Sequence, residues 1–393
     1  MPNKEEMILE TLVKELDLPD STYDKAKNRY EDLGEWFNRE ESTLKSNNVH
    51  IFPQGSFMLG TSIRPLQEGD EYDLDLACKL KQGVSKSSHS QKELKGLVGN
   101  ELEAYRTARG IIEELNEKHR CWRLEYHDEI SFHMDIVPAI PADDIKKSNL
   151  LENMNRVGTL EHVAKDASQL AVSITDNQLP AFNDISDDWN ISNPEGYCVW
   201  FKEQMKTAQT RSILEKALVD DLPIYKQKTP LQRCVQLLKR HRDMMFKDNE
   251  DSKPISIIIT TLAAKAYNGE TDIVSALTNI IENMSRMIEP SSPRVPNPVN
   301  PEEDFADKWN MDKYSNLRLE DNFYIWVQQA KSDFHAIIKS NDPVLLNENF
   351  YKKFAVKMEH ETIKKKVGID GSNAAAYKPK EHIIQSPPKP WGK

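Results

Sequence analysis

The chain has 393 residues, of which 38% are hydrophobic and 29% charged, and its formal net charge is -11 at pH 7. This length and apolar content suffice for one large domain or two ordinary ones. The acidic balance argues against the basic surface that binding of long nucleic acid requires. The four cysteines are scattered, which argues against a zinc site or a disulfide framework and fits a reducing cytosol.

No segment predicts secretion or a membrane span. The first residues, MPNKEEMILETLVKEL, lack the apolar core of a signal peptide. The longest apolar run, residues 255–266, is too short to cross a bilayer and contains threonines, which is typical of a buried core helix. We therefore expect a cytoplasmic protein that does not bind membranes.

The first half of the chain predicts helices followed by a short sheet. Residues 5–47 have apolar side chains at helical spacing. A Gly-Ser turn at Gly55 and Ser56 then leads into a short helix over residues 57–61. Residues 72–80 alternate with a period of two, which predicts a half-buried strand. The elements expected next are a polar loop (83–95), a helix (97–118) and strands over residues 122–127 and 131–137, the second ended by Pro138 and Pro141.

Beyond about residue 150 the strand signals fade and helical periodicity dominates. Residues 231–246 form the most amphipathic segment. Residues 289–304 are rich in proline, which predicts no regular structure. Further helices are predicted over residues 255–267, 272–288 and 319–339.

These patterns predict an α+β fold with a short mixed sheet, helices around it and a helical second lobe. We expect three parts. They are the N-terminal helices and sheet core in residues 1–165, a mostly helical lobe that closes the active-site cleft in residues 166–366, and a disordered C-terminal tail in residues 367–393.

Three carboxylates are predicted to converge on one face of the sheet. Asp73 and Asp75 stand two residues apart on one strand, so their side chains share a face. Asp135 points away from the apolar side of a later strand. Like charges this close oppose each other's ionisation, and a divalent cation offsets that cost, since Mg²⁺ binds carboxylates together with substrate phosphates. If the two strands are neighbours, the acids form the arrangement that two-metal nucleotidyl transfer requires.

The Gly-Ser turn would complete this site. Gly55 permits a close approach of the backbone to a ligand, and the amides and hydroxyl at Ser56 can hold phosphate oxygens. Each piece alone is a weak or moderate signal, because surface strands often carry alternating acids. Their combination in this order favours a nucleotidyltransferase over a solvated strand face.

At these motifs the chain resembles the cGAS/DncV-like nucleotidyltransferases (CD-NTases) of bacteria, within the DNA polymerase β-like superfamily. The resemblance covers roughly residues 5–365. It rests on QGSFMLGTSIRP (54–65), EYDLDL (71–76) and FHMDIVPAIP (132–141), and it continues in LLKRHRD (237–243), PISI (254–257) and NPVNPEEDFADKW (297–309).

The resemblance implies that the protein makes a cyclic di- or trinucleotide messenger from NTPs, ATP among them. It implies two Mg²⁺ ions, or Mn²⁺ in their place, and a role in bacterial anti-phage signalling (CBASS) in which the product acts on a separate effector. Conjugation or regulatory proteins are implied partners. A C-terminal tail fits the family, although the terminal Lys393 departs from the small-residue ends associated with conjugation.

The resemblance also implies roles for individual residues. The metal ligands and catalytic acids would be Asp73, Asp75 and Asp135. The phosphate turn would be Gln54, Gly55 and Ser56. Lys239 and Ser256 would contact the triphosphate, and Arg242 would join them because it lies three residues after Lys239 on the same helix face. The alternative for Lys239 and Arg242 is a solvated helix face.

Ser192 and Asn193 fall where DncV-like enzymes place a nucleobase-contacting loop, so both are candidates for reading base edges. Tyr197 and Trp200 could stack on a base, but their spacing on a helix favours core packing. Three histidines lack zinc-ligand spacing and are expected to be ordinary strand and loop residues, namely His119, His127 and His133.

Two other functions stay open. A nucleotidyltransferase that modifies a protein, an RNA or a small molecule would use the same site. The acidic charge argues against an RNA-tail polymerase but not against a protein target. A catalytically dead nucleotide sensor is disfavoured, because all three carboxylates and the Gly-Ser turn are present.

Overall fold

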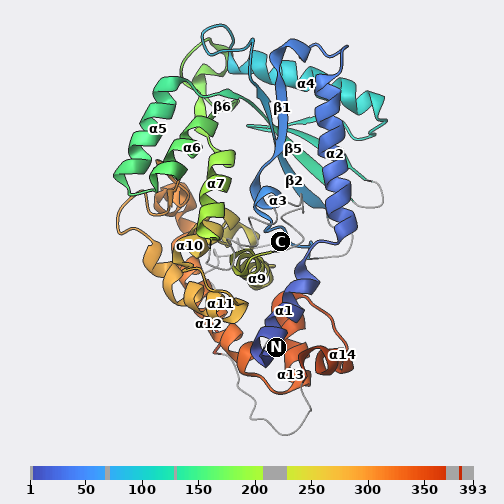
Figure 1. The fold of residues 1–393 in the computed structure, drawn as a ribbon, viewed down its shortest axis with the longest axis vertical. Helices are drawn as coiled ribbons and strands as arrows, with labels where there is room; N and C mark the ends of the chain where they lie inside the picture. Colours follow the sequence, from blue (N-terminus) through green and yellow to red (C-terminus); the bar gives the residue numbers. More distant parts are fainter. Residues whose placement is uncertain (1–2, 67–70, 128–130, 207–227, 369–379, 383–393) are drawn as a thin grey trace, which may run out of the picture. The chain divides into compact units, whose positions relative to one another are not determined.

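The computed structural model describes residues 3–66, 71–127, 131–206, 228–368 and 380–382 (Figure 1). The chain forms two compact units. One is Leu18–Trp200, and the other combines Met1–Asp17 with Phe201–Lys393. The expected division near residue 165 differs from this one because two short strands beyond that point, β6 (Val172–Ile174) and β7 (Asn190–Ser192), extend the sheet.

A seven-stranded mixed sheet forms the centre of the first unit. Its main path runs β1-β2-β5-β4-β3, and β6 and β7 follow from β5. Among the described strands of this sheet, β2 and β5 pair in parallel and the other pairs are antiparallel. The strands not yet bounded are β1 (Val49–Pro53), β2 (Tyr72–Leu80), β3 (Asn116–Glu117), β4 (Trp122–Tyr126) and β5 (Phe132–Pro141). The predicted α+β class with a short mixed sheet is confirmed.

Strand β5 runs through Pro138, where the sequence predicted that it would end. The register explains why this proline is tolerated. Ile136 is the last residue of β5 that pairs with β4, and Ala139 is the first that pairs with β6. The missing N–H of Pro138 therefore falls in the gap between two ladders.

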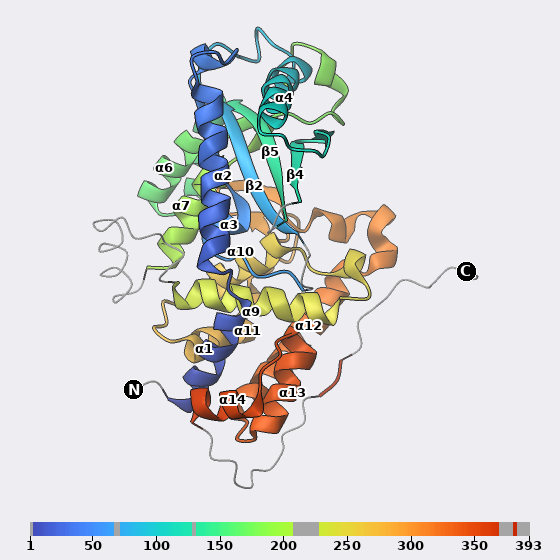
Figure 2. The ribbon, with the colours of Figure 1, turned by 90° about the vertical axis from the view of Figure 1, so that its right-hand side faces the viewer.

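Helices α2 (Asp20–Asn38) and α4 (Gln91–Ala108) pack on one face of this sheet. Figures 1 and 2 show α2 running along the sheet beside β1. Their buried residues share one core with Leu74, Leu76 and Met134 of the strands. Because side chains alternate along a strand, the residues between these face the opposite side of the sheet.

Helix α4 begins and ends earlier than predicted. Ser90 and Glu93 form a capping box that starts the helix inside the expected polar loop. The remaining helices of the unit are α3 (Gly55–Leu59), α5 (Asp144–Arg156), α6 (Glu161–Leu170) and α7 (Pro194–Gln204), the last running past the unit boundary.

The second unit is helical. Its helices are α1 (Lys4–Leu16), α9 (Pro230–Met245), α10 (Ser256–Ala266), α11 (Ile273–Asn283), α12 (Leu319–Lys339), α13 (Pro343–Phe354) and α14 (His360–Val367). Although α1 was expected to go with the sheet, it packs here against α9, α11 and α12. The carboxylate of Glu6 accepts the amides of Ile273 (2.9 Å) and Val274 (3.1 Å) at the start of α11, where the helix dipole favours negative charge.

The proline-rich segment is regular, contrary to expectation. It contains a hairpin of β8 (Pro296–Asn297) and β9 (Asn300–Asp304). Asp304 stabilises it by accepting the backbone amides of Arg294, Val295 and Ala306 at 2.7–2.9 Å. Proline is compatible with this hairpin because Pro296 is the first residue of β8 and Pro301 lies in β9, an edge strand of a two-stranded sheet.

The predicted disordered tail, residues 367–393, lies outside the described residues apart from residues 367–368 and 380–382. No helix within the described ranges combines the length and the apolar character needed to cross a bilayer.

Candidate active site

The strand register brings the predicted acids together. Strands β2 and β5 are parallel neighbours, with Asp75 directly opposite Asp135 and Asp73 directly opposite His133. The expectation that the strand of Asp135 lies beside that of Asp73 and Asp75 is confirmed. All four side chains face away from the core, because Leu74 and Met134 between them are buried.

Strand β4 adds a third column to this face. Arg123 lies opposite Asp135, and Glu125 lies opposite His133. The face therefore carries two rows across three strands. One row is Asp75, Asp135 and Arg123, and the other is Asp73, His133 and Glu125. Acids outnumber bases in both rows together, which favours binding of a cation.

Arg123 holds Asp135 with both arms of its guanidinium. Its Nε and Nη2 each donate at 2.7 Å, one to each carboxylate oxygen. Such bidentate pairs are the strongest charge-assisted hydrogen bonds and fix the plane of the carboxylate. The contact with Asp135 also raises the pKa of Arg123.

His133 bridges two acids. Its Nδ1 lies 2.5 Å from Oε2 of Glu71, and its Nε2 contacts Oδ1 of Asp73. The hydrogen bond to Asp73, helped by the one to Glu71 and opposed by burial, raises the pKa of His133 to about 9. The ring is therefore protonated at neutral pH and donates from both nitrogens.

The expectation that His133 is an ordinary strand residue does not hold. The signal that could have found it is its position two residues before Asp135, because the strand period places both side chains on one face. Arg123 could have been found in the same way, as the outward neighbour of buried Leu124 on the adjacent strand.

The Gly-Ser turn lies against this array. The amide of Gln54 donates to the carbonyl of Asp75 at 2.8 Å, and its side chain donates to the carbonyl of Leu76 at 3.3 Å. Gly55 has a φ of +60°, and a Cβ there would lie 2.6 Å from Oδ2 of Asp75. Only glycine fits this approach. The hydroxyl of Ser56 lies 3.0 Å from that of Ser62.

The carboxylate oxygens on this face are suitable ligands for a hard divalent cation such as Mg²⁺. In the part of the chain that the structure describes, however, Asp73, Asp75 and Asp135 do not bring three ligand atoms within 4.8 Å of one another, whereas Glu113, Glu125 and His127 do. The reason is visible in the contacts above, since Asp135 is directed to Arg123 and Asp73 to His133.

The predicted triphosphate residues lie in the helical unit. Arg242 is 4% exposed, and its guanidinium donates to the carbonyl of Pro254 (2.5 Å), to Ser256 Oγ (3.2 Å) and to Asp243 (2.7 Å). Lys239, on the same helix, is 7% exposed. The alternative of a solvated helix face therefore does not hold for either residue. The structure brings Arg242 and Ser256 together, and their contact with a triphosphate stays a prediction.

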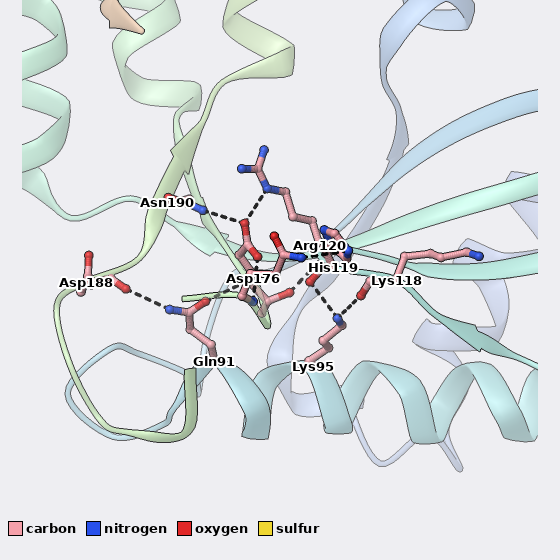
Figure 3. A network of polar contacts seen from close by, with 10 residues as sticks. Gln91, Lys95, Lys118, His119, Arg120, Asp176, Asp188 and Asn190 are labelled. Carbon is pink, nitrogen blue, oxygen red and sulfur yellow. Dashed lines mark hydrogen bonds and ion pairs between the residues drawn. The ribbon is translucent and has the colours of Figure 1, made fainter. Parts of the chain in front are cut away.

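The segment before α7 is held by a polar network on α4 and the strands (Figure 3). Gln91 donates to the carbonyl of Asp188 (2.9 Å) and accepts the amide of Asp176 (2.8 Å). Asp176 in turn accepts from Arg120 (2.8 Å) and Asn190 (3.1 Å). These contacts fix the approach of the chain to Ser192, which is half-buried at the end of β7.

Asn193 has a structural role instead of the predicted contact with a base. It is 4% exposed, its Nδ2 donates to the carbonyl of Ala167 (2.8 Å), and its Oδ1 accepts the amide of Gly196 (3.0 Å). It is the N-cap of α7, so both ends of its amide are engaged. Tyr197 and Trp200 pack in the core, as expected, with ring centroids 5.3 Å apart.

Comparisons with known proteins agree with this geometry. Residues 49–138 match the family described as "Cyclic GMP-AMP synthase DncV-like, nucleotidyltransferase domain". A c-di-GMP synthase of Roseivirga ehrenbergii is 30% identical over 308 residues, covering 77% of this chain and 72% of that protein. The cyclic dinucleotide synthase CdnG of Bradyrhizobium diazoefficiens is 24% identical over 321 residues, covering 77% and 69%.

Comparison with solved structures identifies CdnG as a protein of similar fold. The structure of CdnG from Bradyrhizobium diazoefficiens in complex with GTP superposes with a TM-score of 0.63 at 20% identity, covering 93% of this chain and 98% of that one. The fold and the acidic face of the sheet define a nucleotidyltransferase. Within that class, this chain belongs to the DncV-like nucleotidyltransferases, the CD-NTases.

Proposed function

We propose that this chain joins NTPs into a cyclic dinucleotide, using two divalent cations, Mg²⁺ foremost. The observation that carries the proposal is the pairing of Asp75 with Asp135 across parallel strands, with the Gly55 turn against Asp75. A phosphate held by this turn would lie next to two of the three acids. That is the juxtaposition nucleotidyl transfer needs.

Asp73, Asp75 and Asp135 would hold the cations, which would neutralise the phosphates and acidify the acceptor 3′-hydroxyl. The amides of the Gly55–Ser56 turn and the Ser56 hydroxyl would bind phosphate oxygens of the donor nucleotide. The 3′-hydroxyl of the acceptor attacks the α-phosphorus of the donor, its proton passes to solvent, and pyrophosphate leaves. A second attack of the same kind within the linear dinucleotide releases a second pyrophosphate and closes the ring. Because Arg123 fixes the plane of the Asp135 carboxylate, we assign to Asp135 the orientation of the reacting groups.

Lys239 and Ser256 are the proposed triphosphate contacts of the helical unit. Arg242 would support them by holding Ser256, since all three nitrogens of its guanidinium already donate to protein groups. Ser192 remains the candidate for a nucleobase edge. Gln54 would keep the turn in place through its two hydrogen bonds to β2.

The two named relatives make cyclic dinucleotides, and the solved structure of CdnG contains GTP. We therefore propose GTP as the first substrate to test, with ATP beside it. The product would serve as a messenger in bacterial anti-phage defence by acting on a separate effector. Conjugation or regulatory proteins belong to the same proposal.

The test is to incubate the purified protein with each NTP and each pair of NTPs in the presence of Mg²⁺, and to identify products by mass spectrometry. A cyclic dinucleotide with release of pyrophosphate is expected. Asp75→Asn should reduce the rate about 1,000-fold, because several kcal/mol of transition-state stabilisation depend on metal ligands.

The matched control is Asp187→Asn, which changes an exposed acid of the same unit outside the site. It should leave the rate unchanged. Mass added to a protein, an RNA or a small molecule without cyclic product would replace the proposal by the acceptor-modifying alternative. Full activity of Asp75→Asn would refute the site.

A further inference from the structure

We propose that Glu71 and His133 form a bridge to Asp73 that fixes the orientation of this carboxylate for cation binding. His133 is then a positioning residue. The inference rests on the proposed function, in that it takes Asp73 to be a cation ligand. Glu71 and His133 lie within the motifs EYDLDL and FHMDIVPAIP, but the sequence analysis assigned neither residue a role in the site.

The register makes the bridge a property of the sheet. His133 and Asp73 are directly opposite in the parallel ladder of β5 and β2. The ladder continues one step further, because the amide of Tyr72 donates to the carbonyl of Ser131 at 3.0 Å. Glu71 is thereby held next to His133, with 2.5 Å between its Oε2 and Nδ1 of the ring.

The contact with His133 restricts the rotamers of Asp73. Its side chain is 73% exposed, whereas that of His133 is 17% exposed. An exposed carboxylate on a strand is surrounded by water rather than by packed neighbours, so little apart from hydrogen bonding limits its rotamers. The imidazole contacts one carboxylate oxygen, Oδ1. Coordination of a cation through the other oxygen is compatible with such a hydrogen bond.

Glu71 is itself anchored from a second side. Its Oε1 lies 3.2 Å from Nδ1 of His127, so each of its oxygens faces a histidine. The ring of His133 is therefore oriented by a carboxylate that cannot turn away without losing another partner. Outer contacts of this kind orient metal ligands in many proteins, and their loss typically costs about 10- to 100-fold in metal affinity or activity.

Two effects of removing His133 have opposite signs, which makes the proposal testable. By electrostatics alone, loss of a ring that contacts the carboxylates of Glu71 and Asp73 would leave more negative charge uncompensated and would tighten cation binding. By loss of positioning, it would weaken cation binding. The direction of the change therefore separates a positioning residue from a mere countercharge.

The experiment measures Mn²⁺ affinity by electron paramagnetic resonance with a non-hydrolysable GTP analogue, together with the metal dependence of turnover. His133→Phe should raise the Mn²⁺ dissociation constant about 10-fold or more and lower kcat at fixed metal, with a smaller effect on the KM for GTP. His133→Gln, which can still donate to Asp73, should recover part of the affinity. Glu71→Gln should fall between wild type and His133→Phe.

The matched control is His119→Phe, which removes a histidine of the same unit whose ring contacts Gln178 rather than an acid of the site. Its Mn²⁺ affinity should equal that of wild type. If His133→Phe does not fold, as judged by circular dichroism, Glu71→Gln and His133→Gln carry the test. Unchanged or tighter Mn²⁺ binding in the folded variants overturns the inference.

Failure of this inference is distinguishable from failure of the proposed function. If Asp75→Asn loses Mn²⁺ and turnover but His133→Phe retains both, only the bridge is refuted. If Asp75→Asn retains both, the site itself is refuted.

Discussion

The two units hold their candidate site residues in different ways. On the sheet face, Asp73 and Asp135 contact His133 and Arg123 on neighbouring strands. Asp73 is exposed, and Asp75 and Asp135 are half-buried. In the helical unit, Lys239 and Arg242 are cations buried within α9. A charge that stays near water can change partners when a ligand arrives, whereas a buried charge must keep its partners or lose stability.

Helix α9 shows how far this burial extends. His241, between Lys239 and Arg242, is 1% exposed and lies 2.9 Å from the equally buried Asp333 of α12. Trp326 donates to the other nitrogen of the same ring at 3.1 Å. We infer that His241 and Arg242 stabilise the helical unit through these contacts, whereas Lys239 remains a proposed triphosphate contact.

The largest effect in this comparison is predicted for Gly55→Ala. The added Cβ would lie 2.6 Å from Oδ2 of Asp75, and the backbone of the new alanine would have to keep a φ of +60°. We expect turnover to fall about 100-fold, since displacement of reacting groups by about 1 Å can cost this much. Initial rates of pyrophosphate release measure it.

The matched control is Gly110→Ala, where φ is +63° and a Cβ would meet no atom within 4 Å. Both variants carry the same backbone strain, which costs roughly 1 kcal/mol of stability. Only Gly55→Ala should lose activity. Equal activities in the two variants would show that the turn does not serve the site.

The next effect concerns stability rather than catalysis. Arg242→Met removes the donors to the Pro254 carbonyl, Ser256 and Asp243. We expect a loss of about 3 kcal/mol in the free energy of unfolding, because the buried carbonyl of Pro254 and the half-buried carboxylate of Asp243 lose their charged partner. Urea unfolding without nucleotide measures it.

Arg233→Met on the same helix is the matched control. Arg233 pairs with Glu10 and its side chain is 26% exposed, so about 1 kcal/mol or less is expected. If Arg242→Met unfolds like wild type but binds GTP more weakly, Arg242 is a direct triphosphate contact and the contrast between the units disappears.

Strong periodicity explains what could be predicted of the fold. The strand expected over residues 72–80 is β2, and the helix expected over residues 319–339 is α12. Nine alternating residues or six helical turns average out single exceptions. Strands of two or three residues, such as β6 and β7, contain too few side chains to show a period. They form because a neighbouring strand is already in place.

Periodicity also explains which residues of the site could be predicted from the sequence. The period of two placed Asp73, Asp75 and Asp135 on outward faces, and the pairing of β2 with β5 then confirmed their proximity. The partners Arg123 and His133 depend on register between strands, which periodicity along one strand does not give. Asn193 was misread because an N-cap and a base-reading loop favour the same residue type.

The smallest predicted effect concerns Asn193 and tests its assignment as the N-cap of α7. Asn193→Ala removes the cap of α7 and the contact with the Ala167 carbonyl, and we expect a loss of about 1 kcal/mol in the free energy of unfolding. Ser192→Ala should leave stability within about 0.5 kcal/mol, as for most substitutions away from caps and core, and change the ratio of GTP to ATP incorporation if Ser192 contacts a base. Both quantities come from urea unfolding and from competition assays with mixed NTPs. A changed GTP-to-ATP ratio in Asn193→Ala at wild-type stability would return Asn193 to the nucleotide site, because a buried cap can act on base selection only by first loosening the helix that it caps.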